Sequence, residues 1–395
     1  MMGHVLLLVA LQNAPPDSGG GSSLDIALAT FGPGPGLDNW FGHTAIFVVD
    51  HATGAQRLFS YGLPAAGPGA WRGELTGNPV AEASSTDARA VFAAAGARGR
   101  SVRLQYLDLP ADARLRLLRM LQRDLRPGRR YFVYRYLSDN CTTRPRALID
   151  SVTAGALRVA GQAPWPATVR HTLRPQAELG FATQFFIELF TNNEIDHALD
   201  SWSAAAIPDG LSALVGQAVV GPSHRPLVRD VQFSAARPPA AEHMGAGTVF
   251  LLAGCALAAV ALSLASSVRR GSRAARTLLG AESAVLGIAL GFPAMALMIL
   301  ALFTDYSFAA HNENLIAVSP VLLLAVPFGI AFARGRPASA AQVTKTWVCA
   351  AVLAILGVAL KAIPSFDQDN WRVLALATPA IAGMAAAMVI ANRVR

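Results

Sequence analysis

The chain has 395 residues, enough for two or three domains, and 53% of them are hydrophobic. Its mean hydropathy of +0.39 is high for a soluble protein. The net charge of +8 would suit nucleic acid, but the basic residues cluster between long apolar blocks, which favours a membrane protein instead. Three cysteines are too few for a disulfide framework.

The first segment, residues 1–22, is predicted to be a leader. Val5–Leu11 is apolar but short, and no Lys or Arg precedes it, so it makes a poor signal peptide. Gly19-Gly20-Gly21 fits a flexible end to this leader.

Residues 23–220 carry charges throughout and are predicted to form one folded α+β domain outside the membrane. Amphipathic leucines indicate a helix over 111–125, ended by Pro127-Gly128, and another helix is expected after Pro145. A linker with four prolines is expected over 221–245. Strands are predicted at four places, 23–31, 41–50, 57–61 and 102–107.

Residues 246–395 are predicted to form an all-α membrane domain, because they contain five apolar blocks of nearly bilayer length. The intervening segments 269–276 and 334–345 are rich in basic residues, whereas 304–314 and 364–370 contain acids. The positive-inside rule therefore predicts a cytoplasmic C-terminus and an exported N-terminal domain. The predicted spans are 246–268, 281–303, 315–333, 346–363 and 372–391.

Cys141 is the one cysteine outside the apolar blocks, and it follows the polar run Ser138-Asp139-Asn140. A lone thiol with a remote histidine, here His43 at the start of a strand, is the minimal set for covalent thiol catalysis. Asp139 or Asn140 is expected to cap a helix whose N–H groups favour a thiolate and an oxyanion. Because Pro145 disfavours a regular first turn, the regular helix is expected to start near residue 145.

The residues themselves leave two further readings open. The papain-like pair of residues also fits a membrane-anchored cysteine peptidase or amidase that acts on cell-wall peptides. Alternatively, Cys141 is a buried core cysteine of a non-catalytic membrane receptor or scaffold. No histidine has the spacing of a metal-binding helix, and no nucleotide-binding glycine pattern is present, so no metal and no cofactor is expected.

The motifs Trp40–Ala45, Tyr61-Gly62 and Asp139–Arg144 resemble the periplasmic domain of the Lnb family of bacterial lipoprotein N-acyltransferases. Similarity continues through 170–174, 196–211 and 311–315. The order of histidine before cysteine also resembles the circularly permuted papain-like fold of the NlpC-like and lecithin:retinol acyltransferase groups.

The resemblance implies that Cys141 is the nucleophile and His43 the base, with Ser60 or Tyr61 orienting the histidine. It implies acyl transfer from a phospholipid, through a thioester, to the α-amine of a diacylated lipoprotein. The expected location is the periplasmic face of the bacterial cytoplasmic membrane, with no nucleic acid as partner. Weaker candidates for substrate binding are Asn140, Asp139, Arg144, His311 and Asn314.

Overall fold

The computed structural model describes residues 20–34, 41–65, 70–174, 181–233 and 246–393, so nearly all of the predicted leader lies outside the described residues. The chain divides into two compact units. The sheet unit comprises residues 1–178 and 197–241, and the helical unit comprises 179–196 and 242–395. This confirms an α+β region followed by membrane-type helices.

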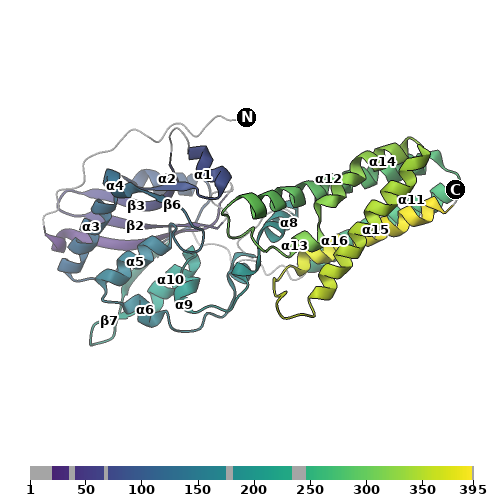
Figure 1. Ribbon diagram of the computed structural model, residues 1–395. Coiled ribbons are helices and arrows are strands. Elements are labelled where there is room, and N and C mark those ends of the chain that lie inside the picture. The colour runs from purple at the N-terminus through teal and green to yellow at the C-terminus, as the bar shows by residue number, and fades with distance from the viewer. Residues whose placement is uncertain (1–19, 35–40, 66–69, 175–180, 234–245, 394–395) are drawn as a thin grey trace. The chain divides into compact units, whose positions relative to one another are not determined.

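The sheet unit is built on seven antiparallel strands in the order β6-β4-β3-β2-β1-β5-β9 (Figure 1). Four of these strands lie where the sequence predicts them: β1 Leu24–Phe31, β2 His43–Asp50, β3 Ala55–Pro64 and β5 Val102–Leu107. The sequence analysis missed three: β4 Val80–Asp87, β6 Tyr131–Val133 and β9 Val228–Phe233.

The missed strands have weak local signals. β4 reads Val-Ala-Glu-Ala-Ser-Ser-Thr-Asp, which is poor in the β-branched and aromatic residues that favour strands. β9 falls in the predicted linker 221–245, and this part of the linker prediction is wrong. Because β9 is an edge strand with a mostly exposed surface, it lacks the apolar alternation of a core strand.

Helices cover both faces of this sheet. Ile46 and Val48 of β2 point to one core, which α3 Ala111–Asp124, α5 Thr143–Val152 and α10 Pro208–Gln217 complete. Ala45 and Phe47 point to a second core against α2 Ala88–Ala97. Five short helices lie in the connections: α1 Ala70–Thr76, α4 Pro127–Arg130, α6 Ala156–Ala160, α7 Val169–Leu173 and α9 Ser201–Ala204. A short strand pair, β7 Val219–Val220 and β8 Arg225–Pro226, completes the unit.

The helical unit contains five segments long and apolar enough to span a bilayer, as predicted. The third span is broken at Pro320 into α13 Asn314–Ala317, a 3-10 turn Pro320–Leu324 and α14 Ala325–Ala333. The basic segments are shorter as loops than expected, since α12 and α15 begin within them. The four continuous helices are α11 Ala246–Arg269, α12 Arg273–Phe303, α15 Pro337–Leu360 and α16 Trp371–Asn392.

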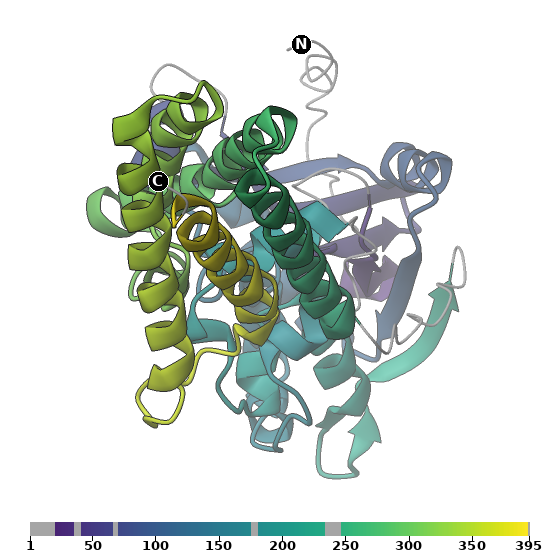
Figure 2. The ribbon, with the colours of Figure 1, turned by 90° about the vertical axis from the view of Figure 1, so that its right-hand side faces the viewer.

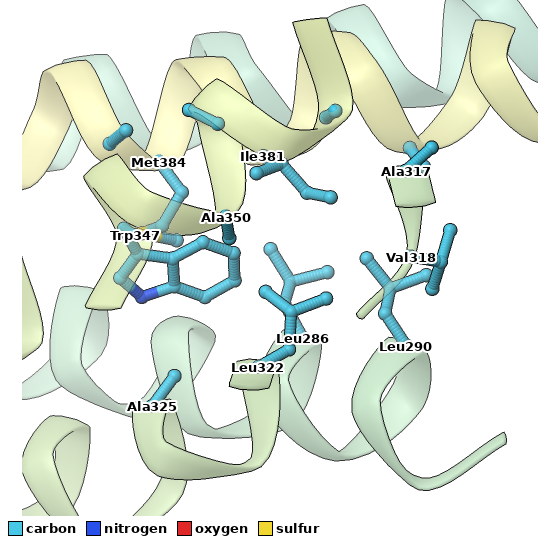
Figure 3. Packing of buried hydrophobic residues seen from close by; sticks show 14 of the residues in the cluster. Leu286, Leu290, Ala317, Val318, Leu322, Ala325, Trp347, Ala350, Ile381 and Met384 are labelled. Atoms are coloured by element: carbon cyan, nitrogen blue, oxygen red, sulfur yellow. The ribbon is translucent and has the colours of Figure 1, made fainter. Parts of the chain in front are cut away.

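Small residues let α11 and α16 run close together (Figure 2). A Cβ atom on Gly254 would lie 2.4 Å from the carbonyl oxygen of Leu376, so only glycine fits there. Trp347 is fully buried between the helices (Figure 3), and its indole Nε1 donates a hydrogen bond to Ser283 Oγ at 2.8 Å. That bond satisfies the polar atom of the largest buried side chain.

One segment predicted for the outer domain belongs to the helical unit instead. Residues 179–196 contain α8 Phe181–Phe190, and the backbone after it is tied to the loops between spans. Asn192 Nδ2 donates to the carbonyl oxygens of Ser307 and Ala310, both at 2.8 Å. The predicted domain 23–220 is therefore corrected. The apolar helix α8 within this range packs with the membrane-type helices instead.

Candidate active site

Cys141 lies in a turn directly before α5, and the regular helix begins at Thr143. The helix therefore starts two residues before Pro145, earlier than expected, while Cys141 remains outside it. Pro145 is tolerated because N–H groups in the first turn of a helix have no intrahelical acceptor to lose.

Asn140 fixes this turn. Its Oδ1 accepts hydrogen bonds from the backbone N–H groups of Thr142 at 2.7 Å and Thr143 at 2.8 Å, and its Nδ2 donates to the Ala206 carbonyl at 3.0 Å. The predicted capping role is thus met by Asn140, but its buried amide is fully used by the protein and is not a substrate-binding group. The helix N–H groups expected to bind an oxyanion are occupied by this cap.

Asp139 and Arg144 bind each other rather than presenting free charges. The guanidinium of Arg144 donates to both carboxylate oxygens of Asp139, at 2.6 and 2.8 Å. The same guanidinium lies over the ring of Phe132, 3.6 Å from its centroid. This bidentate, stacked pair clamps the segment that carries Cys141, so its observed role is structural, contrary to the substrate-binding expectation.

His43 is the first residue of β2, and this end of the strand lies close to the turn that holds Cys141. Its Nε2 is 2.6 Å from Ser60 Oγ on the neighbouring strand β3. Ser60 pairs with Ala45, so its side chain lies on the same face as His43. With Nε2 held by Ser60, Nδ1 is the ring nitrogen left for the thiol.

Ser60 and Tyr61 were equal candidates for orienting the histidine, and the structure separates them. Tyr61 points to the opposite face of β3, where its hydroxyl donates to Asp124 Oδ2 at 2.9 Å. The tyrosine is 2% exposed and belongs to the core under α3 and α5. The Tyr61 candidate is therefore wrong, because adjacent strand residues point to opposite faces.

The environment of Cys141 favours its thiolate. Burial alone raises the pKa of the thiol, but the charge of His43 and hydrogen bonds from His43, Tyr134 and Thr142 outweigh it and lower the pKa to about 6. At neutral pH the sulfur is then mostly ionised, and the thiolate is the nucleophilic form of a catalytic cysteine.

Tyr134 is the site residue that the sequence analysis missed. Its hydroxyl donates to Cys141 Sγ at 3.6 Å. Burial raises the pKa of Tyr134, and the neighbouring Cys141 raises it further, so the phenol stays protonated and remains a donor. No motif signals this residue; only its place just after β6, which ends beside the turn, brings it to the sulfur.

Gly62 leaves room for Tyr134 and Cys141 beside β3. Its φ of +115° lies in the region that favours glycine, at an irregularity in the pairing of β3 with β4. A Cβ atom there would lie 2.9 Å from the Tyr134 ring and 3.5 Å from Cys141 Cβ. Residue 62 must therefore be glycine for the thiol and Tyr134 to approach β3.

His311 and Asn314 lie in the helical unit, whereas Cys141 and His43 lie in the sheet unit. Asn314 is buried, donates to the carbonyls of Glu188 at 2.9 Å and Leu189 at 3.0 Å, and accepts from Asn370, so its amide serves the fold. His311 is exposed, with a positive φ of 51°. Within the part of the chain that is described, no group of three His, Cys, Asp or Glu residues is arranged to hold a metal.

Removing the Ser60 hydroxyl is expected to lower thiol-dependent activity by about 10- to 100-fold, because the imidazole loses the group that fixes its ring. The measurements are the thiol-dependent activity and the pH dependence of Cys141 alkylation. Without the Ser60 hydroxyl, the alkylation profile should shift to higher pH. Ser84→Ala is the matched control: Ser84 is buried opposite Ser60 on β4, and within the described residues its Oγ has no hydrogen-bond partner. Equal losses in both variants would show that Ser60 does not orient His43.

Fold and site together define a membrane-attached α+β protein with a paired thiol and imidazole in its sheet unit. Residues 17–175 match the family model of the Lnb N-terminal periplasmic domain. The chain thus carries an Lnb N-terminal periplasmic domain, and the five apolar helices among its described residues make it a multi-pass membrane protein. No curated protein and no solved structure is significantly similar to the chain.

Proposed function

We propose that this protein is a lipoprotein N-acyltransferase that carries an acyl chain on Cys141. The observation that supports this most is the buried thiol whose pKa is lowered to about 6 by His43, in a chain with five membrane-type helices. Both substrates of such an enzyme are anchored in lipid. A thiol enzyme acting on soluble peptides has no use for five spans.

In the first half-reaction, the Cys141 thiolate attacks the carbonyl carbon of a phospholipid ester. The C–O bond to the glycerol breaks, and the leaving alkoxide takes the proton held by His43. The products are an acyl thioester on Cys141 and a lysophospholipid.

In the second half-reaction, the neutral α-amine of a diacylglyceryl-cysteine lipoprotein attacks the thioester carbonyl. The amine gives a proton to His43, the C–S bond breaks, and the thiolate is restored with an amide on the lipoprotein. The ester supplies the activated acyl group, so the two steps balance without a nucleotide.

Each half-reaction passes through a tetrahedral oxyanion that requires hydrogen-bond donors. Asn140 Oδ1 occupies the N–H groups of Thr142 and Thr143. Tyr134 keeps its proton and lies beside the sulfur. In our proposal its hydroxyl is a donor that stabilises the oxyanion.

The proposal also places the C-terminus in the cytoplasm. Two observations support this orientation: basic segments alternate with acidic ones between the spans, and residues 17–175 match a periplasmic domain. Five spans that start from a periplasmic domain would end the chain in the cytoplasm.

The test is a reconstitution of full-length protein in liposomes with phospholipid carrying a labelled acyl chain and a synthetic diacylglyceryl-cysteine lipopeptide. Label is expected on the lipopeptide α-amine, with one lysophospholipid formed per amide. Cys141→Ala should give neither product.

Two results would contradict the proposal. Cleavage of a cell-wall peptide by the wild-type protein, with no labelled lipopeptide, would make it a peptidase or amidase. No reaction with either substrate class would favour a non-catalytic receptor or scaffold.

A further inference from the structure

Exposed apolar side chains gather at one corner of the sheet unit. Six of the ten large hydrophobic residues that are exposed in the described part of this unit belong to α1, the end of β3, and β6 with its following loop. Trp71 is 60% exposed and Leu75 is 64% exposed. We call the set the α1–β6 patch; it consists of Leu63, Trp71, Leu75, Tyr131, Val133 and Tyr136.

Hydrogen bonds hold α1 next to β6 (Figure 1). Val80, the first residue of β4, pairs with Val133 of β6. Arg135, just after β6, donates to the Gly77 carbonyl at 3.1 Å and to Asn78 Oδ1 at 2.7 Å, in the turn that follows α1. The helix and the edge strand therefore form one fixed surface.

The remaining patch residues lie on the same surface. Glu82 of β4 pairs with Leu63 of β3 on one side and with Tyr131 of β6 on the other, so the three side chains share a face of the sheet. Tyr136 directly follows Arg135, which bonds the turn after α1, so it belongs to the same corner.

The charges around the patch are mainly positive. Arg72, Arg126 and Arg129 are exposed and have no ion pair among the described residues. The Arg72 guanidinium lies 5.6 Å from the centre of the Trp71 ring. Glu74 is the exposed acid at this corner, and the acid on β4 is neutralised by an arginine of α4 at 3.1 Å. A surface that combines exposed Trp, Tyr and Leu with arginines is typical of proteins that bind an anionic lipid interface.

The patch leads to the reactive sulfur. The ring of Tyr136 makes an edge contact with that of Tyr134, with 5.5 Å between their centroids. Tyr134 in turn donates to Cys141 Sγ at 3.6 Å. The rings of Tyr136 and Tyr134 would thus connect a lipid bound at the patch to the thiol.

We propose that the α1–β6 patch is a phospholipid-binding surface, by which the sheet unit takes hold of the outer leaflet and presents a donor ester to Cys141. This rests on the proposed acyl transfer. The occupant is the lipid surface because the patch combines apolar and cationic groups, and because the same chain is held at the bilayer by its spans.

The test uses full-length protein in liposomes of phosphatidylethanolamine and phosphatidylglycerol that contain a phospholipid with a photoreactive acyl chain. Crosslinks mapped by mass spectrometry are expected in peptides 70–76 and 131–136. In the double variant Trp71→Glu, Leu75→Glu, acylation of Cys141 from liposomes should fall about tenfold, because two charges must then be desolvated at the interface. Alkylation of Cys141 by soluble iodoacetamide should not change.

The matched control is Val159→Glu with Phe233→Glu, two exposed apolar residues of the same unit outside the patch. This control is expected to keep both wild-type acylation and crosslinking. Absence of lipid crosslinks at the patch, crosslinks to the acceptor lipopeptide instead, or equal acylation in both double variants would overturn the inference. If wild-type protein forms no acyl adduct, the proposed function fails, whereas the crosslinks still decide whether the patch binds lipid.

Discussion

Under the proposed function, cells in which alanine replaces Cys141 are expected to lose N-acylation of the lipoproteins that depend on this protein. The thiolate is the only group in the site that can form the acyl intermediate, so the loss should be complete rather than partial. Cys141→Ser should be as inactive, since a serine hydroxyl has no low pKa to make it ionised at neutral pH. Mass spectrometry of lipoprotein N-terminal peptides gives the readout.

Two controls make this result specific. Cys255→Ala and Cys349→Ala remove the free cysteines of α11 and α15 and should leave N-acylation unchanged. Cys141→Ala removes one buried sulfur, which costs about 1 kcal/mol of unfolding free energy, so the variant should still accumulate in the membrane. Normal N-acylation in cells with Cys141→Ala would contradict the mechanism.

His43→Ala is expected to impair both the ionisation of the thiol and the proton transfers. With its pKa at about 6, Cys141 is mostly thiolate at pH 7. Without the imidazole, burial dominates and the pKa should rise to at least the ordinary thiol value of about 8.5, which leaves about 3% thiolate. Alkylation at pH 7 should therefore slow by about 30-fold, and acyl transfer by about 100-fold or more because the general base is also lost.

The pH dependence of Cys141 alkylation shows the direction in which His43 shifts the pKa of the thiol. In the wild-type protein, the alkylation rate should rise through pH 6 and level off above it, since the lowered pKa ionises the thiol early. In His43→Ala the rise should come only above pH 8. His51→Ala removes an exposed histidine bound to Asp25 at the far end of β2 and should keep the wild-type profile. Superimposable profiles for His43→Ala and wild type would show that His43 does not lower the pKa of Cys141.

Part of the site could be predicted because its residue types are rare in this chain. Cys141 is the one cysteine of the sheet unit, and His43 begins an apolar strand that alternation identifies. Asn140 was a plausible cap by type and position, and the structure shows that cap. These assignments needed only local sequence and the chemistry of each side chain.

The rest depended on which strands pair and in what register. Ser60 and Tyr61 are neighbours in sequence, and only the pairing of Ser60 with Ala45 shows which one faces His43. Tyr134 reaches the sulfur because the edge strand β6, which the sequence analysis missed, ends beside the cysteine turn. β9 was hidden among prolines and charges, since an edge strand does not require an apolar pattern.

The membrane-type helices were the most predictable part, because each apolar block is long enough to be recognised as a membrane span. The ends of these helices were harder to predict. α12 and α15 extend into the basic segments, since arginine and lysine are good helix formers and continue a helix past its apolar stretch. The break in the third span follows from Pro320.

The central claim is that Cys141 carries the acyl chain, and the most direct measurement is the mass of its own peptide. Full-length protein in liposomes with isotope-labelled phospholipid, without acceptor, is quenched in acid and digested. The account predicts the labelled acyl mass on the peptide containing Cys141, removed by neutral hydroxylamine and absent in Cys141→Ala. An unmodified Cys141 peptide, from protein that still transfers label to the lipopeptide, would contradict it.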